Sequence, residues 1–184
     1  MRFLKPMRVI ALPTVLLVVL TIVATIGATV AHAASLVLVS GQSPYAGCSN
    51  AGQPVTSTNY VNAEVEPYVA VNPHLAGNVV GVWQQDRWSD GGAHGLVAGY
   101  SFDGGATWGE TTLPFSGCAP GAILDPFTGT PYNRASDPWV SMGPDGIAYA
   151  VGLLATNSTI NGNNDTGVAT VTSSNGGKAW ATPA

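Results

Sequence analysis

Charged residues are scarce in this sequence: they make up 9% of its 184 residues, against about a quarter in an average soluble protein. So low a fraction argues against a coiled coil, a disordered acidic tail and a basic nucleic-acid-binding protein. Three of the six cations, Arg2, Lys5 and Arg8, lie at the extreme N-terminus. The rest of the chain carries ten acidic residues and would repel a phosphate backbone, so we expect no nucleic-acid partner.

Helical periodicity is also lacking beyond the N-terminal segment. Gly and Pro are abundant, with 23 and 13 residues, but show no collagen repeat. Between these turn-forming residues lie short β-branched and apolar segments, which predict an all-β fold. We expect strands at residues 68–71, 78–85, 96–101, 110–113, 139–142, 147–154 and 168–173.

The N-terminal segment has the layout of a secretory signal peptide. Its positive charges precede the uncharged residues 9–30, and Ala31-His32-Ala33 forms a small-x-small cleavage pattern. We expect a signal peptide at residues 1–33, and residues 34–63 as an N-terminal extension. The apolar stretch is also long enough to span a bilayer, so an uncleaved anchor is the alternative, and only then would the membrane be a partner. Either way the chain is exported, and a secreted, extracellular protein is predicted.

Only two cysteines are present, Cys48 and Cys118. An oxidising compartment favours a disulfide between them. A metal or redox pair is the weaker alternative, because neither belongs to a C-x-x-C motif or has a nearby His.

An internal repeat determines the expected architecture. Residues 101–108 read SFDGGATW and residues 173–180 read SSNGGKAW, at an offset of 72. Upstream, residues 66–73 correspond to residues 137–144 in the same order. A four-stranded unit repeated together with its turns is typical of a β-propeller blade. We expect a partial propeller over 64–184, with blades at about 64–114 and 136–184.

The motif Ser-x-Asp-x-Gly-x-Thr-Trp is the Asp box, and the chain therefore resembles the sialidase-like (neuraminidase) superfamily of bacterial neuraminidase repeat (BNR) propellers. Residues 101–108 match every defined position, and residues 173–180 are a degenerate copy. The resemblance implies that the box residues are structural and peripheral. It also implies six blades, so two blades predict the N-terminal part of a longer protein, or else a chain closed by oligomerisation. The box residues are Ser101, Asp103, Gly105 and Trp108, and Ser173, Asn175, Gly177 and Trp180.

Sialidases are exo-glycosidases that hold the sialic acid carboxylate with an arginine triad, and use a Tyr–Glu pair and an Asp acid/base. The first arginine of that triad belongs to an Arg-Ile-Pro motif. The equivalent segments in this sequence are 65–67, Val-Glu-Pro, and 136–138, Ser-Asp-Pro, without arginine. Two hypotheses follow: a secreted exo-sialidase-like glycoside hydrolase, or a non-catalytic extracellular propeller that binds glycan or protein. A glycan or glycoconjugate is the expected partner.

The segment after the second expected strand supplies site candidates. Asp90 lies close to the spacing at which the family places its acid/base Asp before the box, and Arg87 would anchor a ligand. The alternative is a turn Asp, with Arg87 paired to Asp86. Trp88 is expected to be exposed in this loop as a sugar-stacking platform.

Ligand-binding candidates also occur where the inner strands begin. Glu66 and Asp137 occupy equivalent places and would bind a ligand, or else begin a strand before proline. Arg134 would hold an anion or pair with Asp137. No cofactor or His-based metal site is expected. Asp165 follows a turn-rich loop that would bind Ca²⁺ or is a plain loop.

Overall fold

The computed structural model describes residues 36–49, 57–156 and 165–181. The chain divides into two units, residues 1–36 and 37–184, and every strand belongs to the second. The predicted signal peptide, residues 1–33, lies outside the described residues. Within the described ranges, no helix has the length and apolar character needed to cross a membrane.

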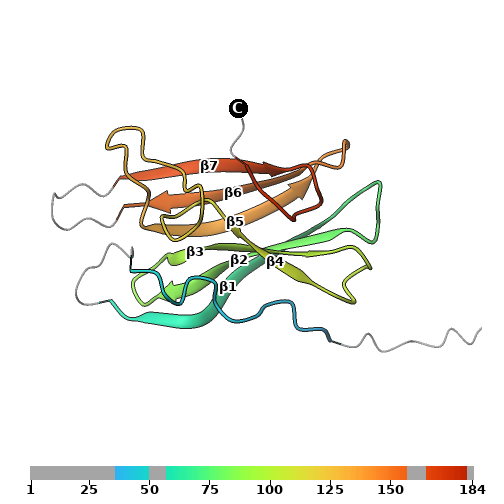
Figure 1. Ribbon diagram of the computed structural model, residues 1–184, viewed down its shortest axis with the longest axis horizontal. Helices are drawn as coiled ribbons and strands as arrows, with labels where there is room; N and C mark the ends of the chain where they lie inside the picture. Colours follow the sequence, from blue (N-terminus) through green and yellow to red (C-terminus); the bar gives the residue numbers. More distant parts are fainter. Residues whose placement is uncertain (1–35, 50–56, 157–164, 182–184) are drawn as a thin grey trace, which may run out of the picture. The chain divides into compact units, whose positions relative to one another are not determined.

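The prediction of an all-β fold is confirmed. The described ranges contain seven strands and no helix (Figure 1). The strands are β1 (Asn59–Val71), β2 (Val79–Trp88), β3 (Ala93–Ser101), β4 (Gly109–Leu113), β5 (Arg134–Met142), β6 (Ala148–Ala155) and β7 (Thr166–Ser173).

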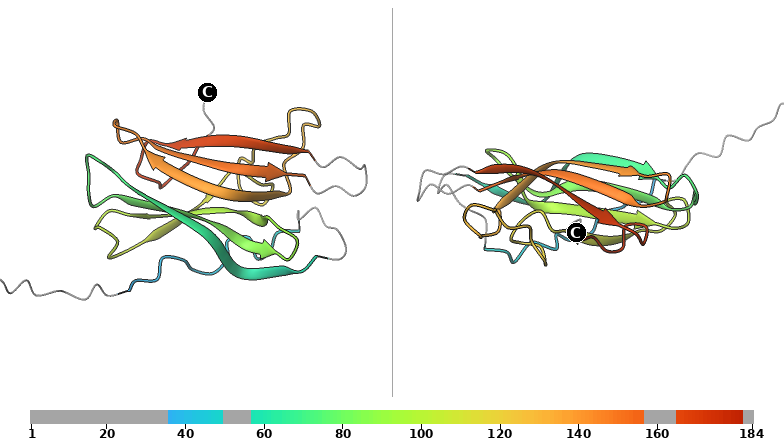
Figure 2. Two further views of the ribbon diagram at one scale, coloured as in Figure 1. Left: turned by 180° about the vertical axis from the view of Figure 1, so that it is seen from behind. Right: turned by 90° about the horizontal axis from the view of Figure 1, so that it is seen from above.

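The seven strands form one antiparallel sheet that is not closed and that folds into two layers (Figures 1 and 2). Strands β1 to β4 pair in chain order and form layer 1, and β5 to β7 do the same and form layer 2. A single pair, Ala93 with Ala135, joins β3 to β5. The isolated pair of Thr172 with Ala181 adds one bridge beside β7.

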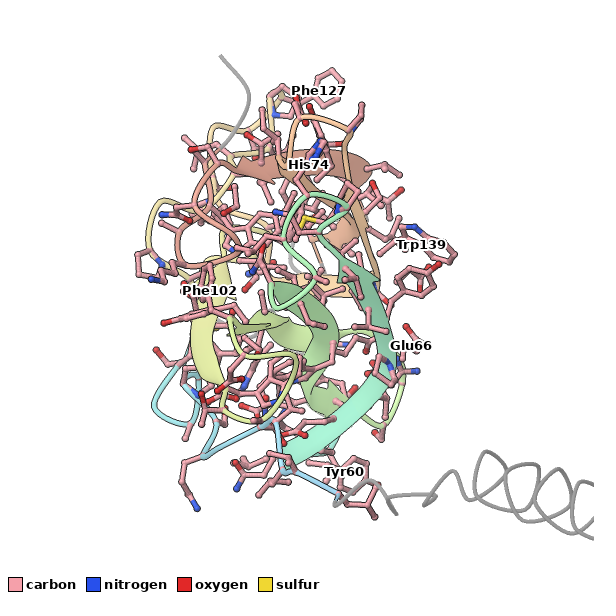
Figure 3. All side chains as sticks on the ribbon, turned by 90° about the vertical axis from the view of Figure 1, so that its right-hand side faces the viewer. Tyr60, Glu66, His74, Phe102, Phe127 and Trp139 are labelled. Atoms are coloured by element: carbon pink, nitrogen blue, oxygen red, sulfur yellow. A yellow bond between two sulfur atoms is a disulfide. The ribbon has the colours of Figure 1, made fainter. Side chains whose placement is uncertain are left out.

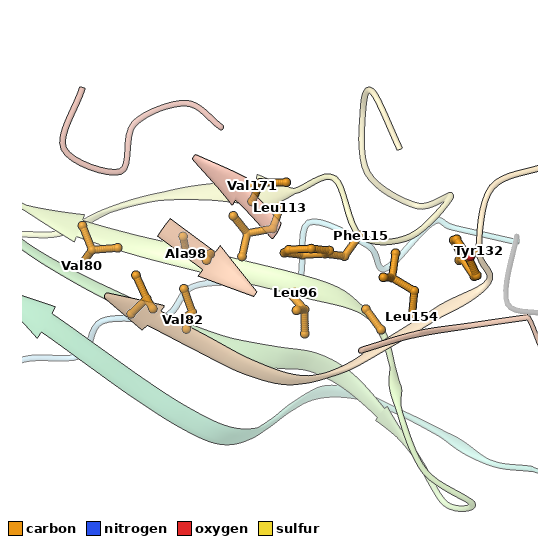
Figure 4. Close-up of a cluster of buried hydrophobic side chains, with 12 residues drawn as sticks. Val80, Val82, Leu96, Ala98, Leu113, Phe115, Tyr132, Leu154 and Val171 are labelled. Carbon is orange, nitrogen blue, oxygen red and sulfur yellow. The ribbon is translucent and has the colours of Figure 1, made fainter. Parts of the chain in front are cut away.

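Alternation of side chains along the strands produces the core between the layers. In β2, Val80 and Val82 face layer 2, whereas Trp83 faces away from it. Figure 4 shows the buried cluster. Its members are Val80, Val82, Leu96, Ala98, Leu113, Phe115, Tyr132, Ala135, Val140, Ala150, Leu154 and Val171.

The segment before β1 covers part of the other face of layer 1. The predicted disulfide between Cys48 and Cys118 is confirmed and ties this segment to the chain after β4. Tyr45 is 1% exposed, and its hydroxyl donates a 2.7 Å hydrogen bond to the carbonyl oxygen of Leu96. A side chain at Gly95 would collide with the Tyr45 ring, so glycine is required there.

A buried carboxylate anchors the same segment. Asp86 accepts hydrogen bonds from the Ser43 hydroxyl at 2.6 Å and from the Asn62 amide at 2.8 Å, and lies 3.2 Å from His94 Nδ1. Burial by itself would raise the pKa of Asp86, but the hydrogen bonds from His94, Ser43 and Asn62 outweigh it and hold the pKa below the usual value. The side chain therefore stays ionised and links three segments of the chain.

Both Asp boxes adopt the same hydrogen-bonded loop. The Ser101 hydroxyl accepts from the Gly105 amide at 2.9 Å and donates to Asp103, which accepts from the Thr107 amide at 2.9 Å. The Trp108 indole closes the loop on the Gly105 carbonyl oxygen. In the second box, Ser173, Asn175, Ala179 and Trp180 repeat these bonds at 2.9 to 3.1 Å around Gly177.

Three expectations about strand limits were wrong. Strand β5 begins at Arg134 rather than at residue 139 and continues across the irregularity between Ser136 and Trp139. The first strand begins at Asn59 rather than at residue 68, and register shifts after Tyr60 and after Val65 let it continue across two irregularities. The segment from Asp86 to Trp88 was expected in a loop. It belongs to β2, because Arg87 still pairs with Ala93 of β3.

We expect Asp103→Asn to fold, because Asn175 occupies the equivalent place in the second box. Hydrogen bonds from Thr107, with the contribution of Ser101, hold the pKa of Asp103 below its usual 3.8. Its contribution to stability is therefore complete above about pH 4 and is lost as the pH falls further. The loss of stability between pH 7 and about pH 2.5, measured by urea unfolding, should be smaller in Asp103→Asn than in the parent protein. An equal loss in both proteins would show that Asp103 does not contribute to it.

Candidate functional site

Glu66 and Asp137 lie at equivalent irregularities of the two layers. The register shifts between Val65 and Tyr68 in β1, and between Ser136 and Trp139 in β5. At these points Glu66 has φ 56° and Asp137 has φ 50°. Left-handed backbone in a residue with a side chain costs roughly 1–2 kcal/mol. The repeat therefore preserves a strained acidic residue, and strain of this kind concentrates at functional sites.

The aromatic residues that follow these acids meet across the two layers. The rings of Tyr68 and Trp139 stack with centroids 3.6 Å apart and planes inclined by 23°. Both remain accessible, with Trp139 51% and Tyr68 36% exposed. Figure 3 shows Trp139 and Glu66 on one side of the unit, while Phe102 of the first Asp box lies on the other side.

A buried glutamine connects the acids to one another. Gln84 is fully buried, and its amide nitrogen donates to the Glu66 carboxylate and, at 3.0 Å, to the Ser136 hydroxyl. Ser136 in turn donates to Asp137 at 2.9 Å. The Gln84 oxygen accepts from Arg87 Nη1 at 2.8 Å. The network fixes the positions of both carboxylates, while Glu66 and Asp137 themselves stay exposed. We call Glu66, Tyr68, Asp137 and Trp139 the junction site.

Arg87 is paired within this network. Its Nη1 lies 3.8 Å from Glu66 Oε1, and no ion pair with Asp86 is formed, so the predicted alternative partner was wrong. Asp86 is instead bound to Ser43, Asn62 and His94. Both members of the Arg87–Glu66 pair are partly exposed, so the pair adds at most about 1 kcal/mol to stability. The Glu66 carboxylate does, however, balance the positive charge of Arg87.

A second cleft lies beside Asp90. Arg134 is 5% exposed, and its Nη1 donates to Asp90 Oδ1 at 2.7 Å and to the Gly91 carbonyl oxygen at 2.9 Å. The guanidinium carbon lies 4.8 Å from the centre of the Trp88 ring. The cleft has a volume of about 290 Å³. Its lining includes Asp90, Gly91, Gly92, Arg134, Ser136 and Thr166.

The environment of Asp90 favours its ionised form. Partial burial would raise the pKa of Asp90, but hydrogen bonds from Ser57 and Arg134, and the charge of Arg134, outweigh it and lower the pKa. A general acid needs a pKa near the working pH, so this environment suits a charge partner better than a proton donor.

Two further expectations about this cleft were wrong. Trp88 is 4% exposed rather than solvent-facing, since it packs against His94 and beneath Arg134. Arg134 pairs with Asp90 across the layers and not with Asp137. Sequence spacing could not show this, because Asp90 lies 44 residues away along the chain.

The Ca²⁺ expectation rests mainly on residues 161–164, which lie outside the described residues. Asp165 itself is described: its carbonyl oxygen accepts from the Thr156 amide at 2.8 Å and its own amide donates to Thr156 Oγ1 at 2.9 Å. Across the described ranges, no group of three or more His, Cys, Asp or Glu side chains could hold a metal ion.

Sequence reasoning did not identify Tyr68 and Trp139 as a site, nor the role of Gln84. The available signal was positional, since each aromatic follows an acid and a proline at equivalent places in the repeat. The stacking of the two rings could not be predicted from this signal, because it depends on how the two layers are arranged.

We expect the two acid–arginine pairs to differ in their effect on stability. Asp90→Asn leaves the buried Arg134 without its charge partner and should lower the free energy of unfolding by about 1–3 kcal/mol. Glu66→Gln, in the exposed pair, should lower it by less than about 1 kcal/mol. Urea unfolding of both variants measures the difference. Equal effects would contradict the distinction between a buried and an exposed arginine.

Comparison with family models, with curated proteins and with solved structures finds no match to this chain. The geometry of the junction site and of the Asp90 cleft is therefore the basis for the functional argument.

Proposed function

We propose that residues 59–181 are two neighbouring blades of a sialidase-type β-propeller. Three observations support this. Each layer is an antiparallel unit built in chain order, the two Asp boxes have the same hydrogen bonds, and the layers pack face to face. In this arrangement β1 and β5 would be the innermost strands, and the junction site would face the central funnel.

We propose further that the protein is an exported, non-catalytic glycan-binding module. The single observation that carries this proposal is the exposed stack of Tyr68 and Trp139, each two residues after a hydrogen-bonded acid, Glu66 or Asp137. The free face of an aromatic ring can pack against the apolar face of a sugar. Glu66 and Asp137 are acceptors placed to receive hydrogen bonds from sugar hydroxyls. A rigid apolar platform with a few convergent polar groups is the usual form of a small-ligand site.

The hydrolase alternative finds less support. An exo-sialidase needs arginines that are free to bind a carboxylate bidentately. In this chain Arg87 is paired to Glu66. Arg134 uses Nη1 for Asp90 and the Gly91 carbonyl oxygen, while its Nε and Nη2 have no partner among the described residues, and one such arginine does not make a triad. The low pKa of Asp90 also disfavours its use as the proton donor. Two exposed acids at the junction site would repel an acidic sugar, so the arrangement favours neutral saccharides.

The test compares binding of neutral oligosaccharides with binding of their sialylated forms by isothermal titration. Trp139→Ala and Tyr68→Ala should each weaken binding of the neutral ligand about tenfold or more, which corresponds to about 1.4 kcal/mol. Phe127→Ala is the matched control. Phe127 is 89% exposed, and it lies in the chain segment that joins β4 to β5 and not at the junction site. It should bind like the parent protein.

Two results would contradict the proposal. One is binding that Trp139→Ala and Phe127→Ala leave equally intact. The other is hydrolysis of a sialoside that Asp90→Asn abolishes, which would establish the enzymatic alternative instead.

A further inference from the structure

The two layers stack in a head-to-tail sense, and within the described ranges this leaves one face of each layer without a partner layer. Val69 pairs with Gly81 in layer 1, and Val140 pairs with Ala150 in layer 2. These two pairs occupy equivalent places in the repeat. We call the face that carries these residues, and the Trp of the Asp box, the box face. The opposite face of each layer is its back face. The box face of layer 2 packs on the back face of layer 1.

The box face of layer 2 is closed by this contact. Val140 and Ala150 are buried in the core between the layers, and Trp180 packs against that core. The second box also interlocks with layer 1, because the Asn78 amide donates to the Gly176 carbonyl oxygen at 3.0 Å. A side chain at Gly177 would collide with Val80. The second box therefore fits into layer 1.

The box face of layer 1 lacks such a partner within the described residues. Val69 is 58% exposed, and a side chain built at Gly104 would meet nothing within 4 Å. Segment 37–49 covers one part of this face, with Val39 and Tyr45 packed beside Trp83. An apolar groove of about 480 Å³ remains. Its lining includes Val39, Val65, Val69, Gly81, Trp83 and Trp108.

Among the described residues, nothing packs as a layer on the back face of layer 2 either. In layer 1, the back face carries Val82, which pairs with Tyr68 in β1 and with Ala98 in β3, and Leu96 further along β3. By register and repeat offset, the equivalents in layer 2 are Val151, which pairs with Trp139 and Thr170, and Val168 further along β7. Val168 is 73% exposed. This surface is the counterpart of the one that already receives a box face within the chain.

We propose that a second copy of this chain binds head to tail, with the back face of its layer 2 in the groove on the box face of layer 1. The packing between the two layers within one chain is the template for this contact. A heterologous contact of this kind leaves one open face at each end, so it repeats until a ring closes or a filament grows. The contact rests on the packing of the layers and not on glycan binding, but it would place a second chain beside the junction site, because Tyr68 also lines the groove.

The experiment compares single-face variants of the full chain by sedimentation velocity over a wide concentration range. Val69→Asp places a charge in the groove, and Val168→Asp places one on the back face of layer 2. Both positions are exposed in the single chain, so the fold should persist, and far-UV circular dichroism checks that it does. Phe127→Asp is the matched control, since it adds the same charge at an exposed position in the segment that joins β4 to β5.

The parent protein and Phe127→Asp should gain mass as concentration rises, to at least twice the mass of one chain. Each face variant alone should remain monomeric. An equimolar mixture of Val69→Asp and Val168→Asp should form a dimer and stop there, because each variant keeps one intact face. A monomeric parent protein at every concentration would overturn the proposal. Association that persists in both single variants would also overturn it and would place the contact at the strand edges. A mixture of the two variants that stays monomeric would overturn it as well.

Discussion

The faces at which the two β layers of this protein meet are apolar, so each layer needs a partner there to exclude water. Within the part of the chain that the structure describes, this need is met in full at one place, where the box face of layer 2 covers the back face of layer 1 and buries a continuous core. Segment 37–49, held by a disulfide and by the Asp86 hydrogen bonds, covers part of a further face. The direction of the stacking, the location of the junction site and the two open faces all follow from this constraint.

The Asp box converts a local turn into a packing element. The serine and the acid or amide of the box satisfy the backbone donors of the loop, and two glycines with positive φ allow its tight path. The rigid loop then presents the Trp at the face that packs. The same hydrogen bonds form whether that face is covered, as around Trp180, or lines an open groove, as around Trp108. The box is thus a local structure, and its burial depends on the neighbouring layer.

The strands and the repeat could be predicted from the sequence because they depend on local patterns. Short β-branched and apolar segments between turn residues located all seven strands, although β1 and β5 begin well before their expected starts, and the matched boxes indicated the equivalence of the two layers. The start of β1 was missed, since its two irregularities interrupt the alternation. The partners of Arg134 and the burial of Trp88 were missed for another reason. Both depend on contacts between layers, which no local pattern encodes.

The junction site and the Asp90 cleft support different functions, and they contain different tryptophans. Trp139 belongs to the junction site, whereas Trp88 lies beneath Arg134 at the cleft. Placing the ligand at one of them therefore distinguishes a glycan-binding module from a sialidase-like enzyme.

The most direct test is a ¹⁵N NMR titration of the five Trp indole signals with a neutral oligosaccharide, the Trp139 signal being assigned from Trp139→Phe. The account predicts that the Trp139 indole signal moves while that of the buried Trp88 stays in place. A ligand that shifts Trp88 and leaves Trp139 unchanged would contradict it and would assign binding to the Asp90 cleft.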